Sequence, residues 1–371
     1  MDPRSGDAAE LIHRVAVLGG GIAGASAALR LAQGGASPLW ITGTPYTGFK
    51  PGEHLSAAAL PLLKELASDA LLRAEVHRHA HGTYSAWGSD LLVERNAIVQ
   101  LEGPPTVLDR TAFEGALATQ AVTAGAERVD GAVVDVRISG DAWDLILGDR
   151  TVTAQFVFDA TGRKAVVASK FAPRFQADRL TCQYALFTCP AQSTPRPVTL
   201  IEAEARGWWY LSVLADRRAV VNFYSDADLP GFATSDLSRY ARQTQAISAF
   251  LSDYGYRISG AARRIACNST WLAPAIGPGW VAIGDASAAF DPLSSHGMTT
   301  ALWSAIQAAD AYIAQDRTKM QAYADSVARG VQDYLQARTR IYAQEQRWSD
   351  SPFWARRAAS RHPAPEPLDT T

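Results

Sequence analysis

The stretch AVLGGGIAGASAALRLA, residues 16–32, constrains the fold more than any other part of the chain. In a strand–turn–helix unit the first glycine of G-x-G-x-x-G permits the tight turn, the second lets the backbone approach a pyrophosphate, and the third allows close helix–strand packing. Residues 38–42 have the pattern of a second strand, so residues 15–42 predict one βαβ unit of a dinucleotide-binding domain. The expected phosphate cradle consists of Gly19, Gly21, Ile22, Ala23 and Gly24.

The end of the second predicted strand departs from this pattern. A carboxylate that binds the ribose is expected about 20 residues after the glycines, but the sequence there is Ile41-Thr42-Gly43-Thr44. The Thr42 hydroxyl can still donate or accept a hydrogen bond, and we assign it to the cofactor site. The ribose contact itself stays open.

Length, charge and cysteine content narrow the class of protein. A chain of 371 residues is long for one core and favours about two domains. Its net charge of −2 argues against nucleic acid as a partner, and its interrupted apolar runs argue against a membrane span or a signal peptide. Cys182, Cys189 and Cys267 are odd in number and widely spaced, as expected for reduced thiols in a cytoplasmic protein without a metal site.

The order of the remaining patterns predicts an α/β fold. Short alternating runs over residues 128–158 and 180–224 predict a β-meander and an antiparallel sheet, and helices are expected over 55–72, 111–124, 235–254, 298–314 and 320–348. We expect a discontinuous Rossmann-like dinucleotide domain from residues 1–60, 100–165 and 270–315. An antiparallel substrate domain from 61–99 and 166–269 is inserted into it, and residues 316–371 form a C-terminal helical segment and tail.

Two later motifs favour FAD over NAD as the dinucleotide. No second glycine fingerprint is present, so a separate nicotinamide domain is not expected. FDATG, which contains Asp159 and Gly162, and AIGDASAAFDPLSSHGM, residues 282–298, both follow predicted strands. The second motif leads into a helix whose N-terminus would stabilise the negative charge of a reduced flavin.

GGGIAG, Asp109-Arg110, DATG and GDASAAFDP together resemble the single-fingerprint FAD monooxygenases of the para-hydroxybenzoate hydroxylase fold. The nearer resemblance is to the tryptophan-halogenase-like branch, and within it to the flavoprotein maturases of lysine oxidase, glycine oxidase and quinohemoprotein amine dehydrogenase. It is carried by PGEHL (51–55), SAWGS (85–89), LDRTAFEGAL (108–117), GWWYLSVL (207–214), DPLSSHGM (291–298) and RWSDSPFWARR (347–357).

The resemblance implies where FAD would lie. Asp285 would meet the ribityl or pyrophosphate region, Arg110 the adenosine-side phosphate and ribose, and residues 292–297 the isoalloxazine. The rest of the expected FAD site is Asp159, Gly162, Gly284, Pro292, Ser295, Gly297 and Met298.

The reaction implied by the resemblance is hydroxylation of an electron-rich ring, an indole or a phenol, through a flavin C4a-hydroperoxide. Molecular oxygen is the co-substrate, and NAD(P)H or an external reductase supplies electrons. The ring belongs to a small or carrier-bound metabolite or to a tryptophan in a partner protein. A halogenase is disfavoured because Ser85 stands where halogenases carry a lysine, and because GWWYLSVL lacks their W-x-W-x-I-P pattern. A lipid-type reductase, which would share the fold, and a non-catalytic flavin-bound partner module are two further hypotheses.

Three histidines are candidate catalytic residues. His296 lies between two segments expected near the flavin, as an acid or hydrogen-bond partner, although a loop histidine that caps the next helix is an equal alternative. His77, His79 and His81 alternate, so in a strand they would share one face, where His79 or His81 could act as a base toward an indole N–H or a phenol.

Residues near the expected ring are assigned from the same resemblance. His54 is expected at the flavin edge, and Glu53 could equally cap the helix predicted after it. Trp208 and Trp209 must point to opposite faces of their strand, one into a core and one into a substrate chamber. The expected substrate-binding residues are Ser85, Trp87, Trp208, Trp209 and Tyr210.

Overall fold

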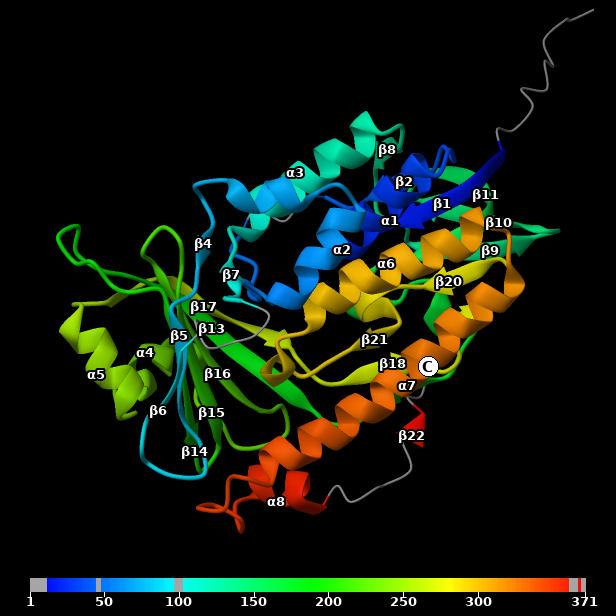
Figure 1. Cartoon of the computed structure of the whole chain (residues 1–371). Helices are drawn as coiled ribbons and strands as arrows, with labels where there is room; N and C mark the ends of the chain where they lie inside the picture. Colours follow the sequence, from blue (N-terminus) through cyan, green and yellow to red (C-terminus); the bar gives the residue numbers. More distant parts are fainter. Residues whose placement is uncertain (1–11, 45–47, 97–102, 360–365, 368–371) are drawn as a thin grey trace, which may run out of the picture.

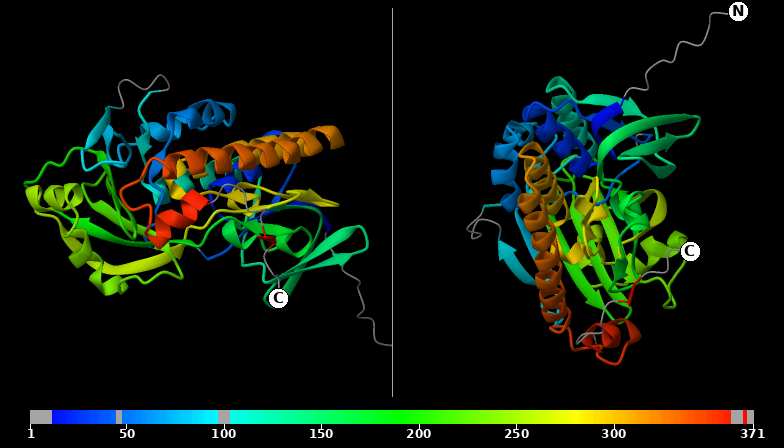
Figure 2. Two further views of the ribbon diagram at one scale, coloured as in Figure 1. Left: turned by 90° about the horizontal axis from the view of Figure 1, so that it is seen from below. Right: turned by 90° about the vertical axis from the view of Figure 1, so that its right-hand side faces the viewer.

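A computed structural model describes residues 12–44, 48–96, 103–359 and 366–367. A mostly parallel sheet forms one end of the molecule and an antiparallel sheet forms the other (Figure 1). The long helix α7 (Arg317–Tyr342) runs along one side of both sheets, and α8 (Pro352–Ala359) follows it. Figure 2 shows the same arrangement from two further sides.

The parallel sheet contains the predicted βαβ unit. Strand β1 (Ile12–Leu18) leads through α1 (Ile22–Gln33) to β2 (Leu39–Thr42), and β1 and β2 pair in parallel. The strand order is β19-β20-β11-β1-β2-β8, with β8 at Glu127–Asp130, β11 at Arg150–Asp159, β19 at Ile276–Gly277 and β20 at Trp280–Ala282. The strands of this sheet come from three separated stretches of the chain.

Helices cover one face of this sheet and a β-meander covers the other. Helices α1, α3 (Arg110–Thr123) and α6 (Gly297–Ile313) pack together, because small residues in α1 let its neighbours approach closely. Asp109 caps α3 by accepting a hydrogen bond from the Ala112 N–H at 2.9 Å. Strands β9 (Asp135–Ser139) and β10 (Ala142–Leu147) continue antiparallel from β11 and bury Trp143 and Leu145.

The antiparallel sheet has the order β17-β13-β16-β15-β14-β5-β6. Its strands are β5 (Gly82–Ala86), β6 (Val93–Asn96), β13 (Leu180–Thr188), β14 (Val198–Glu204), β15 (Gly207–Val213), β16 (Ala219–Asp226) and β17 (Arg257–Ala266). One face packs under α4 (Leu237–Ala241) and α5 (Ala246–Asp253), where Trp209 is buried with Phe223 and Phe232. Trp208 lies on the opposite face with Tyr224, as strand alternation predicts.

Two predicted helices are broken. Residues 55–72 form a 3₁₀ turn (Ala57–Ala59), the short helix α2 (Leu60–Glu65) and a second 3₁₀ turn (Asp69–Arg73). The break after α2 follows from the left-handed backbone of Ala67, whose φ is 54°. Leu63 of α2 packs in the core of the dinucleotide domain, so this piece of the predicted substrate segment 61–99 lies with the other domain. The helix expected over 235–254 is likewise divided into α4 and α5.

Two small sheets connect the larger parts. Strands β3 (His54–Leu55) and β4 (Arg78–His79) both pair with β7 (Thr106–Val107). Strand β12 (Arg174–Gln176) pairs with β18 (Thr270–Leu272) and β22 (Glu366–Pro367), and β18 pairs with β21 (Ala288–Ala289). None of the described helices is both long and apolar enough to cross a membrane.

Candidate active site

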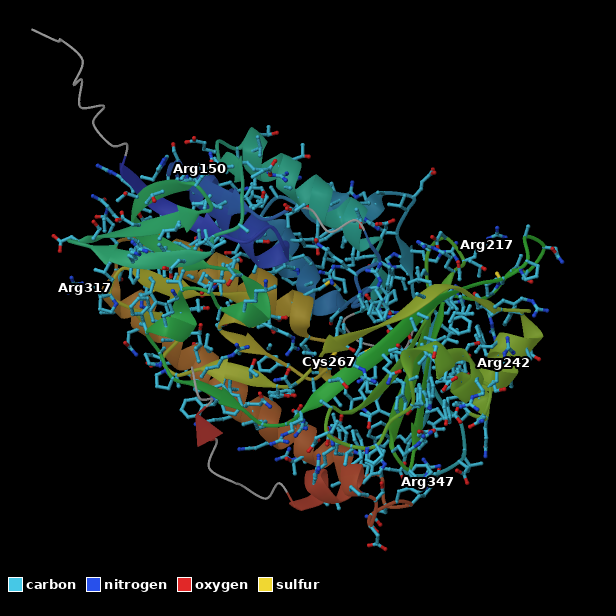
Figure 3. The ribbon with its side chains drawn as sticks, turned by 180° about the vertical axis from the view of Figure 1, so that it is seen from behind. Arg150, Arg217, Arg242, Cys267, Arg317 and Arg347 are labelled. Atoms are coloured by element: carbon cyan, nitrogen blue, oxygen red, sulfur yellow. The ribbon has the colours of Figure 1, made fainter. Side chains whose placement is uncertain are left out.

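A cavity of about 390 Å³ lies where the two main sheets meet, and we call it the junction cavity. Its lining includes Gly21, Ile22 and Gly162 from the dinucleotide domain. It also includes Trp208 and Tyr210 from the antiparallel sheet. Cys267, another lining residue, is labelled between the two halves of the molecule in Figure 3. One continuous space therefore joins the glycine turn to an aromatic wall.

The three glycines of the fingerprint have different tasks. Gly19 has a φ of +122°, and a Cβ atom there would lie 2.2 Å from the carbonyl oxygen of Ala160. A Cβ atom on Gly24 would lie 1.9 Å from the Gly19 carbonyl oxygen. At Gly21 a Cβ atom would meet nothing within 4 Å, and Gly21, Ile22 and Ala23 line the cavity at the start of α1. The turn thus presents a helix N-terminus to the cavity, as a pyrophosphate requires.

Four predicted cofactor residues do not line the cavity but lie next to the residues that do: Gly19, Gly24, Asp159 and Gly284. Asp159 is fully buried and accepts hydrogen bonds from the N–H groups of Val167 and Ala168 at 2.8 and 2.9 Å. Gly284 has a φ of +58° and lies against α1, where a Cβ atom would come 2.7 Å from the Ala23 Cβ. These residues shape the loops that surround the cavity.

Thr42 also lies outside the cavity lining. It is buried, and its hydroxyl donates to Asp130 Oδ1 at 2.9 Å and accepts from Arg128 Nε at 3.2 Å. Asp130 stands beside Thr42 because β8 pairs with β2. Asp130 of the neighbouring strand is thus a hydrogen-bond partner of Thr42, and neither residue lines the junction cavity.

Two arginines line the cavity. Arg110 donates to the Gly52 carbonyl oxygen at 2.9 Å and to Glu114 Oε1 at 2.5 Å, so its guanidinium is fixed beside the turn at residues 51–52. Arg163 donates to the Phe290 carbonyl oxygen at 3.3 Å and lies 3.9 Å from Asp285, which also lines the cavity. Arg110 and Asp285 were expected here from the sequence motifs. Arg163 was not, although it directly follows the DATG motif.

The loop of residues 291–297 forms a third wall. Pro292, Ser295, Gly297 and Met298 line the junction cavity, where the sequence placed the isoalloxazine. Asp291 is buried at the start of this loop, and its Oδ1 accepts a hydrogen bond from the Leu293 N–H at 2.9 Å. Helix α6 begins at Gly297, so its N-terminus opens beside the cavity.

His296 lies on the other side of this loop. Its side chain is exposed, and it lines a second cavity of about 550 Å³ between α6 and α7, together with Trp303 and Tyr334. It does not line the junction cavity. His296 directly precedes α6, but its side chain makes no hydrogen bond that caps this helix, so the capping alternative is not seen in this structure.

The predicted substrate residues divide into two groups. Trp208 and Tyr210 line the junction cavity, whereas Trp209 faces the core under α4 and α5. Trp87 packs against Trp208 with 6.2 Å between ring centroids, and its Nε1 donates to the Ile341 carbonyl oxygen at 3.0 Å. Trp87 and Ser85 do not line the cavity; Ser85 lies on β5, opposite Ile201.

A buried carboxylate faces the aromatic wall. The Tyr210 hydroxyl donates to Glu53 Oε1 at 2.8 Å, and the Gly52 N–H donates to Glu53 Oε2 at 3.1 Å. Burial and the neighbouring Glu53 charge raise the pKa of Tyr210 well above its usual value, so it remains a donor. Glu53 does not cap a helix; Ser56 caps the 3₁₀ turn that follows.

His54, next to Glu53, also lines the cavity. Its Nε2 lies 2.9 Å from Ser212 Oγ and 3.1 Å from Thr199 Oγ1. Burial lowers the pKa of His54 below its ordinary value, against the smaller opposing effect of Glu53. The imidazole is therefore neutral at neutral pH.

The three alternating histidines do not share a face. His77 is buried, and its Nδ1 accepts a hydrogen bond from the Asp109 N–H at 3.1 Å. His79 and His81 are exposed and lie outside the cavity lining. The alternation fails because β4 includes only Arg78–His79, and Ala80 and His81 belong to no strand before β5 begins at Gly82. In the described part of the chain, no cluster of three or more His, Cys, Asp or Glu side chains could hold a metal.

Fold and cavity together define a dinucleotide-binding enzyme with an aromatic chamber beside the cofactor cradle. Residues 106–370 match the family model described as tryptophan halogenase. The chain belongs to the tryptophan halogenase family, a class of FAD-dependent oxidoreductases, as the sequence motifs predicted.

Individual relatives extend this comparison. The FAD-dependent oxidoreductase LodB of Marinomonas mediterranea is 26% identical over 92% of this chain and 96% of its own. The solved structure of QhpG, a peptidyl tryptophan dihydroxylase essential for tryptophylquinone cofactor biogenesis, is 26% identical with a TM-score of 0.77, covering 94% of this chain and 79% of that one. The myxobacterial chondrochloren halogenase CndH has the same fold, with a TM-score of 0.82 at 20% identity over 93% and 86% of the two chains.

Proposed function

We propose that this chain is an FAD-dependent monooxygenase that hydroxylates the ring of a tryptophan side chain in a partner protein. The observation that carries the proposal is the junction cavity, which joins the glycine cradle to the wall formed by Trp208 and Tyr210. A ring on that wall would lie within the same space as the cofactor. Direct oxygen transfer needs such a shared space.

The distribution of lysine favours hydroxylation over halogenation. Lysine occurs at five positions, 50, 64, 164, 170 and 319. None of the five is among the described residues that line the junction cavity, and Lys50 pairs with Glu114 at 2.5 Å. Ser85, which replaces the halogenase lysine in the sequence comparison, does not line the cavity either.

The residues present fit FAD. The N-terminus of α1 would hold the pyrophosphate, Arg110 and Arg163 would balance its charge, and residues 292–298 would contact the isoalloxazine. When bound and reduced, FAD supplies one oxygen atom of dioxygen to an electron-rich ring. The N-terminus of α6 would favour the reduced, negatively charged flavin.

The remaining lining residues would hold and desolvate the substrate ring. Trp208 and Ile201 offer apolar contact, and Trp208 is itself buried, so an indole placed there would exclude water. The Tyr210–Glu53 pair offers a polar contact at this wall, with its proton held on the Tyr210 oxygen. The protein-borne tryptophan is favoured by the likeness to QhpG over nearly the whole chain.

The test is oxygenation of a defined substrate by the FAD-loaded protein. When NADH or NADPH and dioxygen are supplied, we expect the FAD-loaded protein to raise the mass of a peptide with one tryptophan by 16 or 32 units. Sodium bromide in the same reaction should leave the product free of bromine. A bromine isotope pattern in the product would support the halogenase alternative, and failure to bind FAD would refute the whole proposal. Reduction without oxygen uptake would instead indicate a reductase.

A further inference from the structure

The outer edge of β17 is the feature of this fold that the proposed reaction leaves unused. Strand β17 is the end strand of the antiparallel sheet, and among the described strands it pairs only with β13. Nine of its ten residues are exposed, and Ala262 is half-buried. An open strand edge of this length is unusual, because its unpaired N–H and C=O groups invite another strand.

This edge leads directly into the junction cavity. Ile265, Ala266 and Cys267, at the end of β17 and just beyond it, line the cavity. Figure 3 shows β17 on the face turned to the viewer, running toward Cys267. The cavity lining found among the described residues includes none from β6, the strand at the opposite edge of the sheet.

The register of β17 identifies the backbone groups that face outward. The Cys267 N–H donates to the Leu180 carbonyl oxygen at 2.9 Å, and Ile265 pairs with Cys182. In an antiparallel pair the residues alternate between facing the partner strand and facing away from it. The backbone N–H and C=O groups of Arg264 and Ala266 therefore point away from β13.

We propose that an extended, acidic, tryptophan-bearing segment of the partner protein docks on this edge as an eighth strand of the sheet. This inference rests on the proposed function, since it supplies the path by which a protein-borne tryptophan reaches the cavity. Adjacent strands lie about 4.8 Å apart, so a side chain of the added strand would lie next to Ile265 at the cavity wall.

Charge selects this occupant over a second copy of the chain. Strand β17 carries three arginines, Arg257, Arg263 and Arg264, and no carboxylate. Two copies of such an edge would repel one another, whereas glutamates or aspartates in a docking segment would be attracted. Gly260, at a φ of +87°, lies where the register of β17 with β13 shifts. This irregularity would limit pairing of the docked segment to the half of β17 near the cavity.

The experiment measures binding of a synthetic peptide to the FAD-loaded full chain. The peptide has twelve residues, a central tryptophan, two glutamates and alternating valine and threonine. Its twin carries N-methyl groups on alternate amides, which block strand pairing. Fluorescence anisotropy gives the Kd of each, and amide hydrogen exchange reports protection at Arg264 and Ala266.

We expect the peptide to protect these two amides, and the twin to bind about tenfold more weakly or worse. Arg264→Pro removes an outward N–H and should weaken binding of the peptide by a similar factor, whereas Arg264→Ala, which keeps that N–H, should weaken it about threefold or less. FAD content and melting temperature show whether each variant folds. If Arg264→Pro does not fold, the comparison of the peptide with its N-methylated twin tests the proposal.

Equal binding of the two peptides, absence of protection at Arg264 and Ala266, or no binding of either peptide would overturn the proposal. Protection of β17 only by the chain itself at high concentration would indicate a second copy as the occupant and would also overturn it. These readouts need neither oxygen nor reductant. A negative result here is therefore distinct from failure of the proposed hydroxylation, which the mass of the product decides.

Discussion

The hydroxyl of Tyr342 donates a hydrogen bond to Oδ2 of Asp291 at 2.7 Å. The same hydroxyl accepts a hydrogen bond from Trp208 Nε1 at 3.1 Å. One buried oxygen atom on α7 therefore joins the loop of residues 291–297 to the aromatic wall of the junction cavity. Arg338, one turn earlier on α7, lies 3.5 Å from the same Asp291 oxygen.

Removing this hydroxyl should loosen both walls of the cavity. In Tyr342→Phe, the Trp208 N–H loses its acceptor and Asp291 loses a donor, both in buried surroundings. We expect the free energy of unfolding to fall by about 1–3 kcal/mol, measured by urea denaturation. Tyr312→Phe is the matched control, since its hydroxyl bond to the Arg14 carbonyl oxygen is exposed and should contribute about 0.5 kcal/mol or less. Equal losses in the two variants would contradict a structural role for the Tyr342 bridge.

Substitutions at two of the fingerprint glycines should distinguish the effect on FAD binding from the effect on folding. Gly21→Ala places a methyl group in open space at the cradle, so the free energy of unfolding should change by less than about 1 kcal/mol. The same methyl group should weaken FAD binding about tenfold or more. Gly24→Ala drives a methyl group into the Gly19 carbonyl oxygen and should cost about 3 kcal/mol or prevent folding. Flavin fluorescence titration and thermal melting measure the two effects. A Gly21→Ala protein with normal FAD affinity would show that the cofactor does not use this turn.

His54 should make stability depend on pH. Its pKa in the folded protein lies below that of the unfolded chain, about 6.5. The unfolded state therefore binds the proton more readily, and stability falls as the pH drops through 6.5 toward the folded pKa, by up to about 1.4 kcal/mol per pH unit. His54→Gln keeps a polar group near Ser212 but does not titrate, so its urea midpoint should fall less between pH 7.5 and 5.5. His77, whose pKa is also lowered, remains in both proteins and cancels in the difference.

His296→Ala tests the catalytic interpretation of this residue. General acid or base catalysis typically contributes a factor of 10² to 10⁴ in rate. Because His296 lies outside the junction cavity and is exposed, we expect turnover of the peptide substrate to fall less than about threefold. A loss of about 100-fold with unchanged FAD affinity would restore the catalytic interpretation.

Tyr210→Phe should act on both stability and turnover. The change leaves the buried Glu53 Oε1 without the hydrogen bond that the Tyr210 hydroxyl donates, at a cost of about 1–3 kcal/mol in unfolding free energy. We expect kcat to fall more than FAD affinity, because Tyr210 lines the aromatic wall while the glycine turn is untouched. Glu53→Gln in the same background should recover part of the lost stability, since a neutral amide is less costly to bury unpaired than a carboxylate. No recovery would indicate that the pair does not contribute through Glu53.

The sequence by itself determined the features that arise within one short stretch. The βαβ unit at residues 12–42, the cap of α3 by Asp109 and the opposite orientations of Trp208 and Trp209 all follow from local backbone geometry. The motifs at 159–162 and 284–298 could be recognised in the sequence for a related reason. Each ends a strand of the parallel sheet or leads into the helix after it.

Only the tertiary structure decided which side chains from distant parts of the chain meet. Tyr210 and Glu53 are 157 positions apart, Thr42 and Asp130 are 88 apart, and Tyr342 and Asp291 are 51 apart. Likewise, the side of the 291–297 loop on which His296 emerges depends on how α6 packs against α7. Local propensity fixes the direction of a side chain relative to its own strand or helix. The packing of one element on another fixes what that side chain touches, and here that packing, rather than the glycine motif, makes the wall on which a substrate ring would bind.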